Sequence, residues 1–278
     1  VALKDQYDGA VWVDWPKGIR CREKNSINEL KEKLRRKIDF EKFVQYLFFE
    51  QWKSLRKFCN DQGVEIFGDL PIYVTQDSSD VWANPEYFKL DDNGNPTVVA
   101  GVPPDYFSKT GQLWGNPVYD WDVLKQDSYQ WWMQRLQYTL GIMDITRIDH
   151  FRGFLAAWEV PAGDKTAENG FWQPVPGVEF FSKVLEKFSD ANIVAEDLGL
   201  ITDEVREFMD HCEFPGMKIL VFAFDSDLKT NPYLPHNFSE NCVVYTGTHD
   251  CNTVKGWFEN DMSSHQKSNL FEYLGKRV

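Results

Sequence analysis

Four acidic residues follow short apolar runs that have the length of buried strands. They are Asp69 after Val64–Phe67, Asp149 after Ile142–Ile148, Glu196 after Ile193–Ala195 and Asp250 after Val243–Thr246. In parallel α/β folds the carboxyl ends of the strands form the active face, so we expect these four side chains to gather there. Acidic residues also follow strands as turn formers or helix caps, and this alternative stays open for any one of them taken alone.

A group of carboxyl side chains is what the cleavage of a glycosidic bond requires. One carboxyl group protonates the leaving oxygen and a second, ionised one attacks or stabilises the oxocarbenium-like centre, so their surroundings must differ. Arg147 stands two residues before Asp149, on the same face of a strand, where its guanidinium favours the ionised carboxylate. Glu196 follows the apolar run Ile-Val-Ala, which favours a raised pKa and a protonated acid. Asp250 with His249 is a candidate for binding sugar hydroxyls and straining the ring.

Other kinds of catalytic site find little support in the sequence. His150 and His249 stand beside Asp149 and Asp250, as metal ligands can, but no H-x-x-x-H or H-E-x-x-H spacing occurs. No G-x-S-x-G elbow marks a nucleophilic serine, and neither of the glycine-rich nucleotide-binding patterns is present. We therefore expect no metal and no cofactor.

Composition and charge narrow the class of partner. The 278 residues include 43 acidic and 30 basic ones, for a net charge of −13, and 42% are hydrophobic, which is a globular composition. The acidic balance argues against a nucleic acid or an anionic membrane as partner. Five cysteines without a C-x-x-C pair indicate reduced thiols, and neither a signal peptide nor a membrane-spanning stretch is visible. These features favour a cytoplasmic protein, or a plastid protein if the source is a plant or an alga.

The elements that must position the acidic residues follow from periodicity and turn residues. Residues 1–25 lack a clear pattern and are expected to be a connector, and Ser26–Glu29 fits a capping box for a helical region that ends at Gly63. Beyond it, strands that include Met217–Phe224 alternate with amphipathic helices near residues 129–140, 178–188, 205–212 and 264–274. This alternation favours a parallel sheet with crossover helices. We therefore divide the chain into a connector and helical subdomain at 1–63 and a catalytic part at 64–278.

A long segment at about 75–121 is rich in Asp, Asn, Pro and Gly and is expected to be a loop insertion. Its part GVPPDYFSKTGQLWGNP carries five candidates for substrate binding: Asp105, Tyr106, Phe107, Trp114 and Asn116. Aromatic faces stack on sugar rings, and Asp and Asn side chains bond hydroxyl groups. Polar residues stand next to these aromatic residues in the sequence, which favours a substrate lid. Burial of the rings in the core stays an alternative.

Seven motifs contain these residues and follow one another from about residue 40 to 270: GDLPIYV, WANPEYF, VAGVPPDYFSKTGQLWGNP, TRIDHFRGF, VAEDLG, PGMK and VYTGTHD. In kind and order they resemble the motifs of the amylomaltases, the 4-alpha-glucanotransferases also called disproportionating enzymes. The resemblance implies a (β/α)8 TIM-type barrel with inserted helical and loop subdomains. It also implies an enzyme of starch or glycogen metabolism that transfers α-1,4-glucan segments between maltooligosaccharides through a covalent glycosyl-enzyme. Family members are longer, so we expect only part of the barrel within these residues.

Carried over by position, the resemblance implies a role for each candidate. Asp149 would be the nucleophile, Glu196 the acid/base and Asp250 the carboxylate that stabilises the transition state. Supporting glucose-site positions would be Asp69, Arg147, His150 and His249, and the flexible loop over the glucan would carry Tyr106, Phe107 and Trp114. Cys251 stands where the family usually has Asn, which puts one supporting hydrogen bond in question. A hydrolase of the α-amylase type with the same carboxylates and a glucan-binding protein without turnover remain alternatives.

Overall fold

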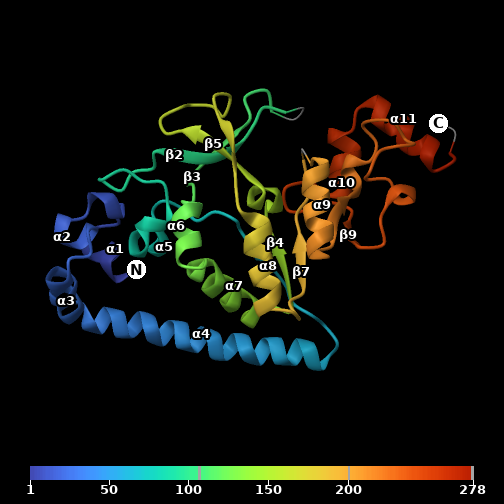
Figure 1. Ribbon diagram of the computed structural model, residues 1–278. Helices are drawn as coiled ribbons and strands as arrows, with labels where there is room; N and C mark the ends of the chain where they lie inside the picture. Colours follow the sequence, from blue (N-terminus) through green and yellow to red (C-terminus); the bar gives the residue numbers. More distant parts are fainter. Residues whose placement is uncertain (106–107, 200, 277–278) are drawn as a thin grey trace. The chain divides into compact units, whose positions relative to one another are not determined.

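The computed structural model of the protein describes residues 1–105, 108–199 and 201–276. The chain forms two compact units (Figure 1). Unit 1 consists of Val1–Thr146 and Gly153–Asn192, and unit 2 consists of Arg147–Arg152 and Ile193–Val278. The short segment Arg147–Arg152 therefore places Asp149 in the same unit as Glu196 and Asp250.

The first part of unit 1 is helical. Its elements are α1 (Ala2–Gln6), η1 (Trp12–Asp14), α2 (Lys17–Arg20), α3 (Lys24–Lys33) and the long helix α4 (Arg35–Asp61). Residues 1–25, expected to be a connector, thus contain short helical turns, anchored by the buried side chains of Trp12 and Ile19. The predicted capping box is wrong, because α3 begins at Lys24 without a side-chain cap. The predicted end of the helical region is confirmed, because Gly63 adopts the left-handed conformation that terminates α4.

A four-stranded antiparallel sheet takes in much of the segment that we expected to be loop. The sheet has the order β3 (Gln112–Pro117), β2 (Val98–Val102), β5 (Ala156–Pro161) and β6 (Phe171–Pro174), and α5 (Ser79–Ala83) and η2 (Pro85–Tyr87) come before it in the chain. On β5 the buried carboxylate of Glu159 pairs with Lys89, with 2.6 Å between Oε1 and Nζ. The sequence signal for this sheet is weak because β3 is polar and contains Gly and Pro, which are typical of turns.

Aromatic side chains form the centre of unit 1 between its later helices. These helices are α6 (Trp121–Gln126), α7 (Gln130–Ile142) and α8 (Gly177–Lys187). Trp132 of α7 is fully buried and packs on Trp121, Phe154 and Phe180, with ring centroids 6.3, 5.1 and 5.8 Å away. The predicted helices near 129–140 and 178–188 are confirmed, and their apolar faces build this core.

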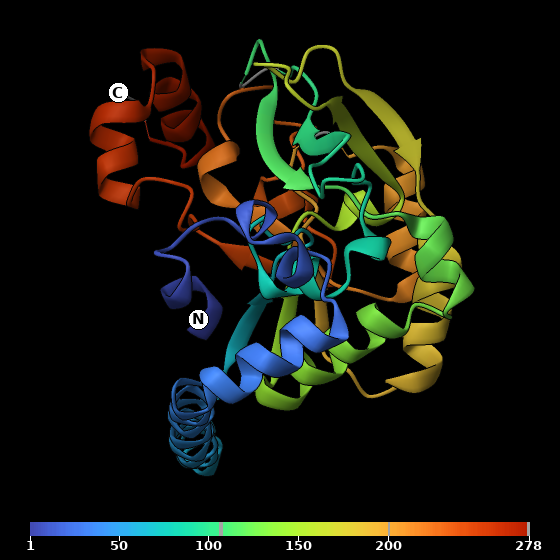
Figure 2. The same ribbon diagram turned by 90° about the vertical axis from the view of Figure 1, so that its left-hand side faces the viewer.

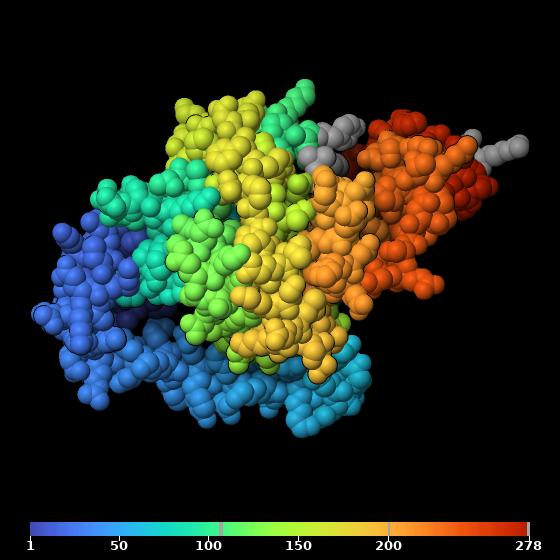
Figure 3. Space-filling view, viewed as in Figure 1, coloured from blue at the N-terminus to red at the C-terminus, as the bar shows by residue number. Residues whose placement is uncertain are grey.

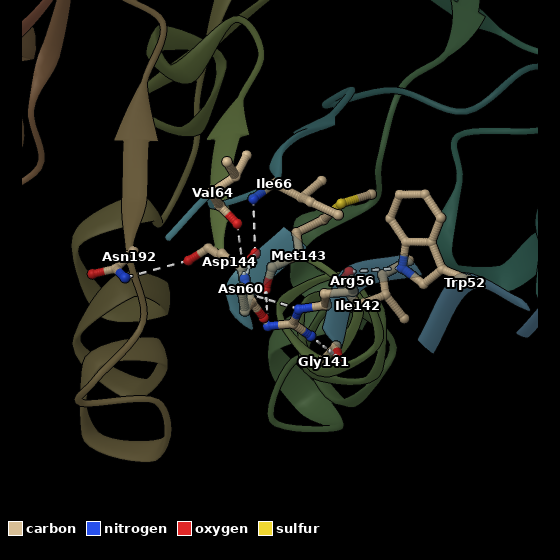
Figure 4. Close-up of polar contacts among 10 residues, drawn as sticks. All are labelled: Trp52, Arg56, Asn60, Val64, Ile66, Gly141, Ile142, Met143, Asp144 and Asn192. Atoms are coloured by element: carbon tan, nitrogen blue, oxygen red, sulfur yellow. Dashed lines mark hydrogen bonds and ion pairs between the residues drawn. The ribbon is translucent and has the colours of Figure 1, made fainter. Parts of the chain in front are cut away.

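Polar contacts fasten α4 to the end of α7 (Figure 4). Trp52 Nε1 donates to the carbonyl of Ile142 at 2.9 Å, and Arg56 donates to the carbonyls of Gly141 at 2.7 Å and Met143 at 2.9 Å. The last carbonyl groups of a helix have no partner inside it, so these two side chains supply the missing donors. The C-terminal half of α4 thereby holds the turn that leads into strand β4 (Ile145–Ile148).

Asp144, in that same turn, is the acceptor at the centre of these contacts. Its carboxylate accepts from Arg56 Nε at 2.8 Å, from Asn60 Nδ2 at 2.9 Å and from the backbone N–H of Ile66 at 2.7 Å. Its backbone carbonyl accepts from Asn192. Burial opposes ionisation of Asp144, but the three donors outweigh it and lower the pKa of the carboxyl group.

The rest of α4 lies at the surface of unit 1, as Figures 2 and 3 show. None of its residues is buried. The exposed apolar side chains recur at helical spacing: Phe40, Phe43, Val44, Leu47, Leu55 and Phe58. The side of α4 that carries Arg56 makes the polar contacts with Asp144, so much of the apolar surface of this helix stays exposed in unit 1.

Unit 2 continues the alternation of strands and helices. Its elements are the end of β4, the start of η3 (Phe151–Phe154), β7 (Ile193–Ala195), α9 (Asp203–Cys212), β8 (Gly216–Ile219), η4 (Leu220–Phe222), η5 (Pro235–Asn237), β9 (Cys242–Tyr245), α10 (Val254–Gly256), η6 (Trp257–Asp261) and α11 (Ser264–Tyr273). β8 and β9 are parallel, with Gly216 opposite Cys242. Phe224, Leu234 and Met262 form a small core beside them.

The α/β class is confirmed, whereas the (β/α)8 barrel stays a prediction. The described strands form a three-stranded sheet of order β1-β4-β7, in which β1 is Phe67–Leu70, besides the antiparallel sheet and the β8-β9 pair. The strand predicted at Ile193–Ala195 is confirmed, and the one predicted over Ile142–Ile148 begins three residues later because Ile142 closes α7. The strand predicted over Met217–Phe224 ends at Ile219, where η4 turns the chain.

The contacts of Arg56 make a testable prediction about stability. Arg56→Met removes the donors to Asp144 and to two helix-end carbonyls, so we expect the free energy of unfolding to fall by about 2–3 kcal/mol. Lys57→Met is the matched control, because Lys57 pairs with Asp61 at the surface and exposed pairs contribute little. Urea unfolding followed by circular dichroism measures both. Equal losses in the two variants would contradict the role given to Arg56.

Candidate active site

The segment after β4 and the end of β7 bring four of the predicted residues together in unit 2. Arg147 Nη2 lies 2.5 Å from Asp149 Oδ1, and the side chain of Asp149 is 40% exposed. The backbone N–H of His150, the next residue, donates to Glu196 Oε2 at 2.8 Å. A basic residue and a partly exposed carboxylate at the end of β4 therefore stand near a buried carboxyl group at the end of β7.

Glu196 is only 8% exposed and accepts two backbone hydrogen bonds. Besides His150 N–H, the N–H of Leu198 donates to its Oε1 at 2.6 Å. Burial raises the pKa of Glu196 to about 7, and the charge of Asp149 adds to the rise, while the two N–H donors and Arg147 oppose it. Burial is thus the main cause of the raised pKa, in the direction expected from the apolar run before Glu196.

His150 contributes through its backbone conformation. Its φ is +51°, in the left-handed region that a residue with a Cβ adopts rarely, and this turn directs the N–H toward Glu196. The side chain is buried, and burial together with the nearby charge of Arg152 lowers the imidazole pKa to about 3. His150 is therefore neutral near pH 7, so it adds no positive charge beside Glu196.

Backbone contacts hold the end of β7 on both sides. Glu196 N–H donates to the carbonyl of Ile148 at 3.0 Å, and Ala195 N–H donates to the carbonyl of Pro215 at 2.9 Å. These bonds set β7 between the end of β4 and the start of β8. The register of these neighbours decides where the Glu196 carboxyl group lies.

Asp197 and Lys218 belong to this arrangement and were missed by the sequence reasoning. Asp197 Oδ1 accepts from the N–H of Met217 at 2.6 Å, and its Oδ2 lies 3.5 Å from Lys218 Nζ. A Cβ at Gly216 would come within 2.8 Å of Asp197 Oδ2, so only glycine leaves room for this carboxylate. The signal that could have found the pair is the second acidic residue in VAEDLG, together with the Gly-Met-Lys of the next strand.

His249 and Asp250 form an exposed pair in the turn after β9. His249 Nε2 lies 3.4 Å from Asp250 Oδ1, and the two side chains are 75% and 73% exposed. The N–H of Asp250 donates to Thr248 Oγ1 at 3.3 Å, and Cys251 Sγ lies 3.8 Å from the same hydroxyl. The described contacts thus pair the side chain of Asp250 with His249 and hold its backbone. None of these contacts joins Asp250 to Asp149 or Glu196.

The other candidates that the structure describes lie in unit 1. Asp69 is an exposed residue of β1, and Asp105 accepts from Ser108 N–H at 2.7 Å in a turn. Trp114 of β3 is partly exposed and tilts toward the ring of Tyr73, and Asn116 Nδ2 donates to the carbonyl of Val74 at 3.0 Å. Tyr106 and Phe107 lie outside the described residues.

The described residues form neither a metal-binding cluster nor a membrane-spanning helix. Over the described ranges, no three His, Cys, Asp or Glu side chains are grouped so that they could hold a metal ion. In the same part of the chain, no helix has both the length and the apolar character of a membrane span.

Comparison with known proteins assigns the chain to a family. Residues 1–278 match the model of the 4-alpha-glucanotransferase family. The chain is 49% identical over 275 residues to the 4-alpha-glucanotransferase of Clostridium butyricum, covering 99% of this chain and 56% of that protein. It is 48% identical over 276 residues to the 4-alpha-glucanotransferase of Thermus thermophilus, covering 99% and 55%.

A solved structure gives the same assignment. It is that of an amylomaltase from Streptococcus agalactiae in complex with acarbose, 41% identical, with a TM-score of 0.95 over 99% of this chain and 56% of that one. The chain thus spans about half the length of the relatives it matches. The resemblance drawn from the motifs is confirmed, and the chain belongs to the 4-alpha-glucanotransferase family.

Proposed function

We propose that the protein carrying this chain is a 4-alpha-glucanotransferase that moves α-1,4-glucan segments between maltooligosaccharides by a retaining double displacement. The observation that carries the proposal is the burial of Glu196, which raises its pKa to about 7, near the Asp149 carboxylate, which is paired with Arg147. Retaining glycosidases need one protonated and one ionised carboxyl group at the same pH. The names of the relatives support the reaction class.

In this proposal Asp149 is the nucleophile and Glu196 the acid/base. Glu196 protonates the oxygen of the departing glucan while Asp149 attacks the anomeric carbon and forms the glycosyl-enzyme. The covalent bond removes the negative charge of Asp149, which is one of the causes that raise the Glu196 pKa. The pKa of Glu196 then falls, so the group stays ionised after it has given up its proton, and its carboxylate takes the proton of the acceptor hydroxyl in the second step.

The other candidates are assigned to substrate binding. Asp250 with His249 provides the third carboxylate, which the resemblance links to the transition state. In the same proposal, Asp69, Arg147 and His150 belong to the glucose sites. The loop that covers the glucan carries Asp105, Tyr106, Phe107, Trp114 and Asn116. The strands would belong to a (β/α)8 barrel of which this chain supplies part, and the reaction would take place in the cytoplasm or, in plants, in the plastid.

Product analysis on maltotriose tests the function. Transfer produces a ladder of longer and shorter maltooligosaccharides, because a glucan rather than water accepts the glycosyl group. We expect such a ladder by chromatography, and none with the Asp149→Asn variant. Glucose and maltose alone would mean hydrolysis, and binding without any product would mean a glucan-binding protein.

Substitution of Glu196 tests its role. We expect Glu196→Gln to lower kcat/KM on maltotriose by about 10²–10⁴-fold, the usual contribution of an acid/base catalyst. The loss in glycosyl-enzyme formation should shrink with a glycosyl fluoride donor, whose leaving group needs little protonation. Glu207→Gln, an exposed position on α9, is the matched control. The acid role is wrong if Glu196→Gln loses the same factor on both donors.

A further inference from the structure

The segment that follows β1 has left the sheet, yet two of its side chains are buried. β1 ends at Leu70, and the side chains of Ile72 and Tyr73 are 2% and 8% exposed. Backbone carbonyl groups beside buried side chains need hydrogen-bond donors, and residues 71–77 belong to no strand whose partner could supply them. Side chains donate to four of these carbonyls.

Four side chains from different parts of unit 1 meet this need. Arg135 Nη2 donates to the carbonyl of Pro71 at 2.6 Å, and Arg135 Nη1 and Tyr119 Oη donate to that of Ile72 at 3.1 and 2.7 Å. Farther along, Asn116 donates to the carbonyl of Val74 and Trp12 Nε1 to that of Gln76. Arg135 alone reaches two consecutive carbonyls, and they are the ones nearest to Asp69.

The guanidinium of Arg135 is itself held in place. It lies on α7, with its central carbon 4.8 Å from the ring centroid of Trp132 and 5.5 Å from that of Trp131. These tryptophans precede it by three and four residues, so helix geometry alone brings the three side chains together. Because Trp132 is fully buried in the aromatic core, the guanidinium rests on a rigid surface. Its planar fork then bonds the two carbonyls and Tyr119 Oη together, the last at 3.2 Å.

We propose that Arg135 is a positioning residue for glucan binding, which acts by fixing Pro71 and Ile72 and thereby the direction of Asp69. Asp69 stands two residues before Pro71, and buried Leu70 is the link between them. A displacement of about 1 Å at a binding carboxylate is enough to lose much of its contribution. The inference rests on the proposed function, because it takes Asp69 to bind substrate.

A double-mutant cycle tests this link. Arg135→Met, Asp69→Ala and the double variant are prepared in the protein carrying residues 1–278, and acarbose binding is measured by calorimetry. We expect Arg135→Met to weaken binding about tenfold, and to have less than a twofold effect once Asp69 is Ala, because its effect passes through Asp69. Arg135→Lys should recover part of the loss, since one ammonium can bond one carbonyl. Arg35→Met, at an exposed position of α4, is the control.

Each outcome bears on the proposal. Equal weakening by Arg135→Met with and without Asp69 would overturn it and leave Arg135 a purely structural residue. No effect of Asp69→Ala would overturn both the inference and the binding role of Asp69. A coupled pair in a protein that makes no maltotriose ladder would support the inference and refute the transferase function. If Arg135→Met does not fold, as thermal unfolding would show, Tyr119→Phe removes one donor to Ile72 and replaces it in the cycle.

Discussion

A carboxyl group that is almost removed from water stays protonated unless the protein replaces the lost hydration. Glu196 is in this situation, and the candidate site depends on it. Two backbone N–H groups hold the carboxyl group, one from Leu198 and one from His150, whose left-handed turn directs the donor. They fix its position but do not fully compensate for its burial, so its pKa rises to about 7. The neighbouring Asp149, partly exposed and paired with Arg147, has surroundings that favour the charged form.

This arrangement has a cost in stability that follows from its pKa. The carboxyl group of Glu196 moves from an ordinary value of 4.5 to about 7 on folding, so the folded state binds more protons than the unfolded state between these pH values. Stability therefore falls as the pH rises through this window, by about 3 kcal/mol when the group is fully ionised. The left-handed φ of His150 adds strain at the same place. Both features are typical of functional sites, where local stability is lower than packing alone would allow.

The sequence predicted the parts of the site that depend on spacing along the chain. Arg147 and Asp149 share a strand face because they are two residues apart. The apolar run before Glu196 indicated that this residue is buried. Residues whose partners are distant in the chain gave no such signal. Arg135 donates to backbone carbonyls 63 and 64 residues away. Every residue has a backbone carbonyl, so the sequence does not show which ones accept from Arg135.

In the fold, too, the features with a local sequence pattern were predicted and those that depend on distant residues were missed. Strands with a continuous apolar run, such as Ile193–Ala195, were found, whereas β3 was missed because its residues are those of turns. The antiparallel sheet depends on pairing β2 with β5, whose residues stand about sixty positions later, and neither strand alone shows that pairing. Burial in this sheet is a tertiary property that a local pattern does not contain.

The candidate site depends on Glu196 holding its proton up to about pH 7, because the group is buried near the charge of Asp149. The most direct measurement is the carbon-13 NMR titration of the Glu196 carboxyl carbon, assigned by its loss in Glu196→Gln. We expect a midpoint near pH 7, and a lower midpoint in Asp149→Asn, where the neighbouring negative charge is gone. A midpoint near the ordinary value of 4.5, unchanged by Asp149→Asn, would contradict it.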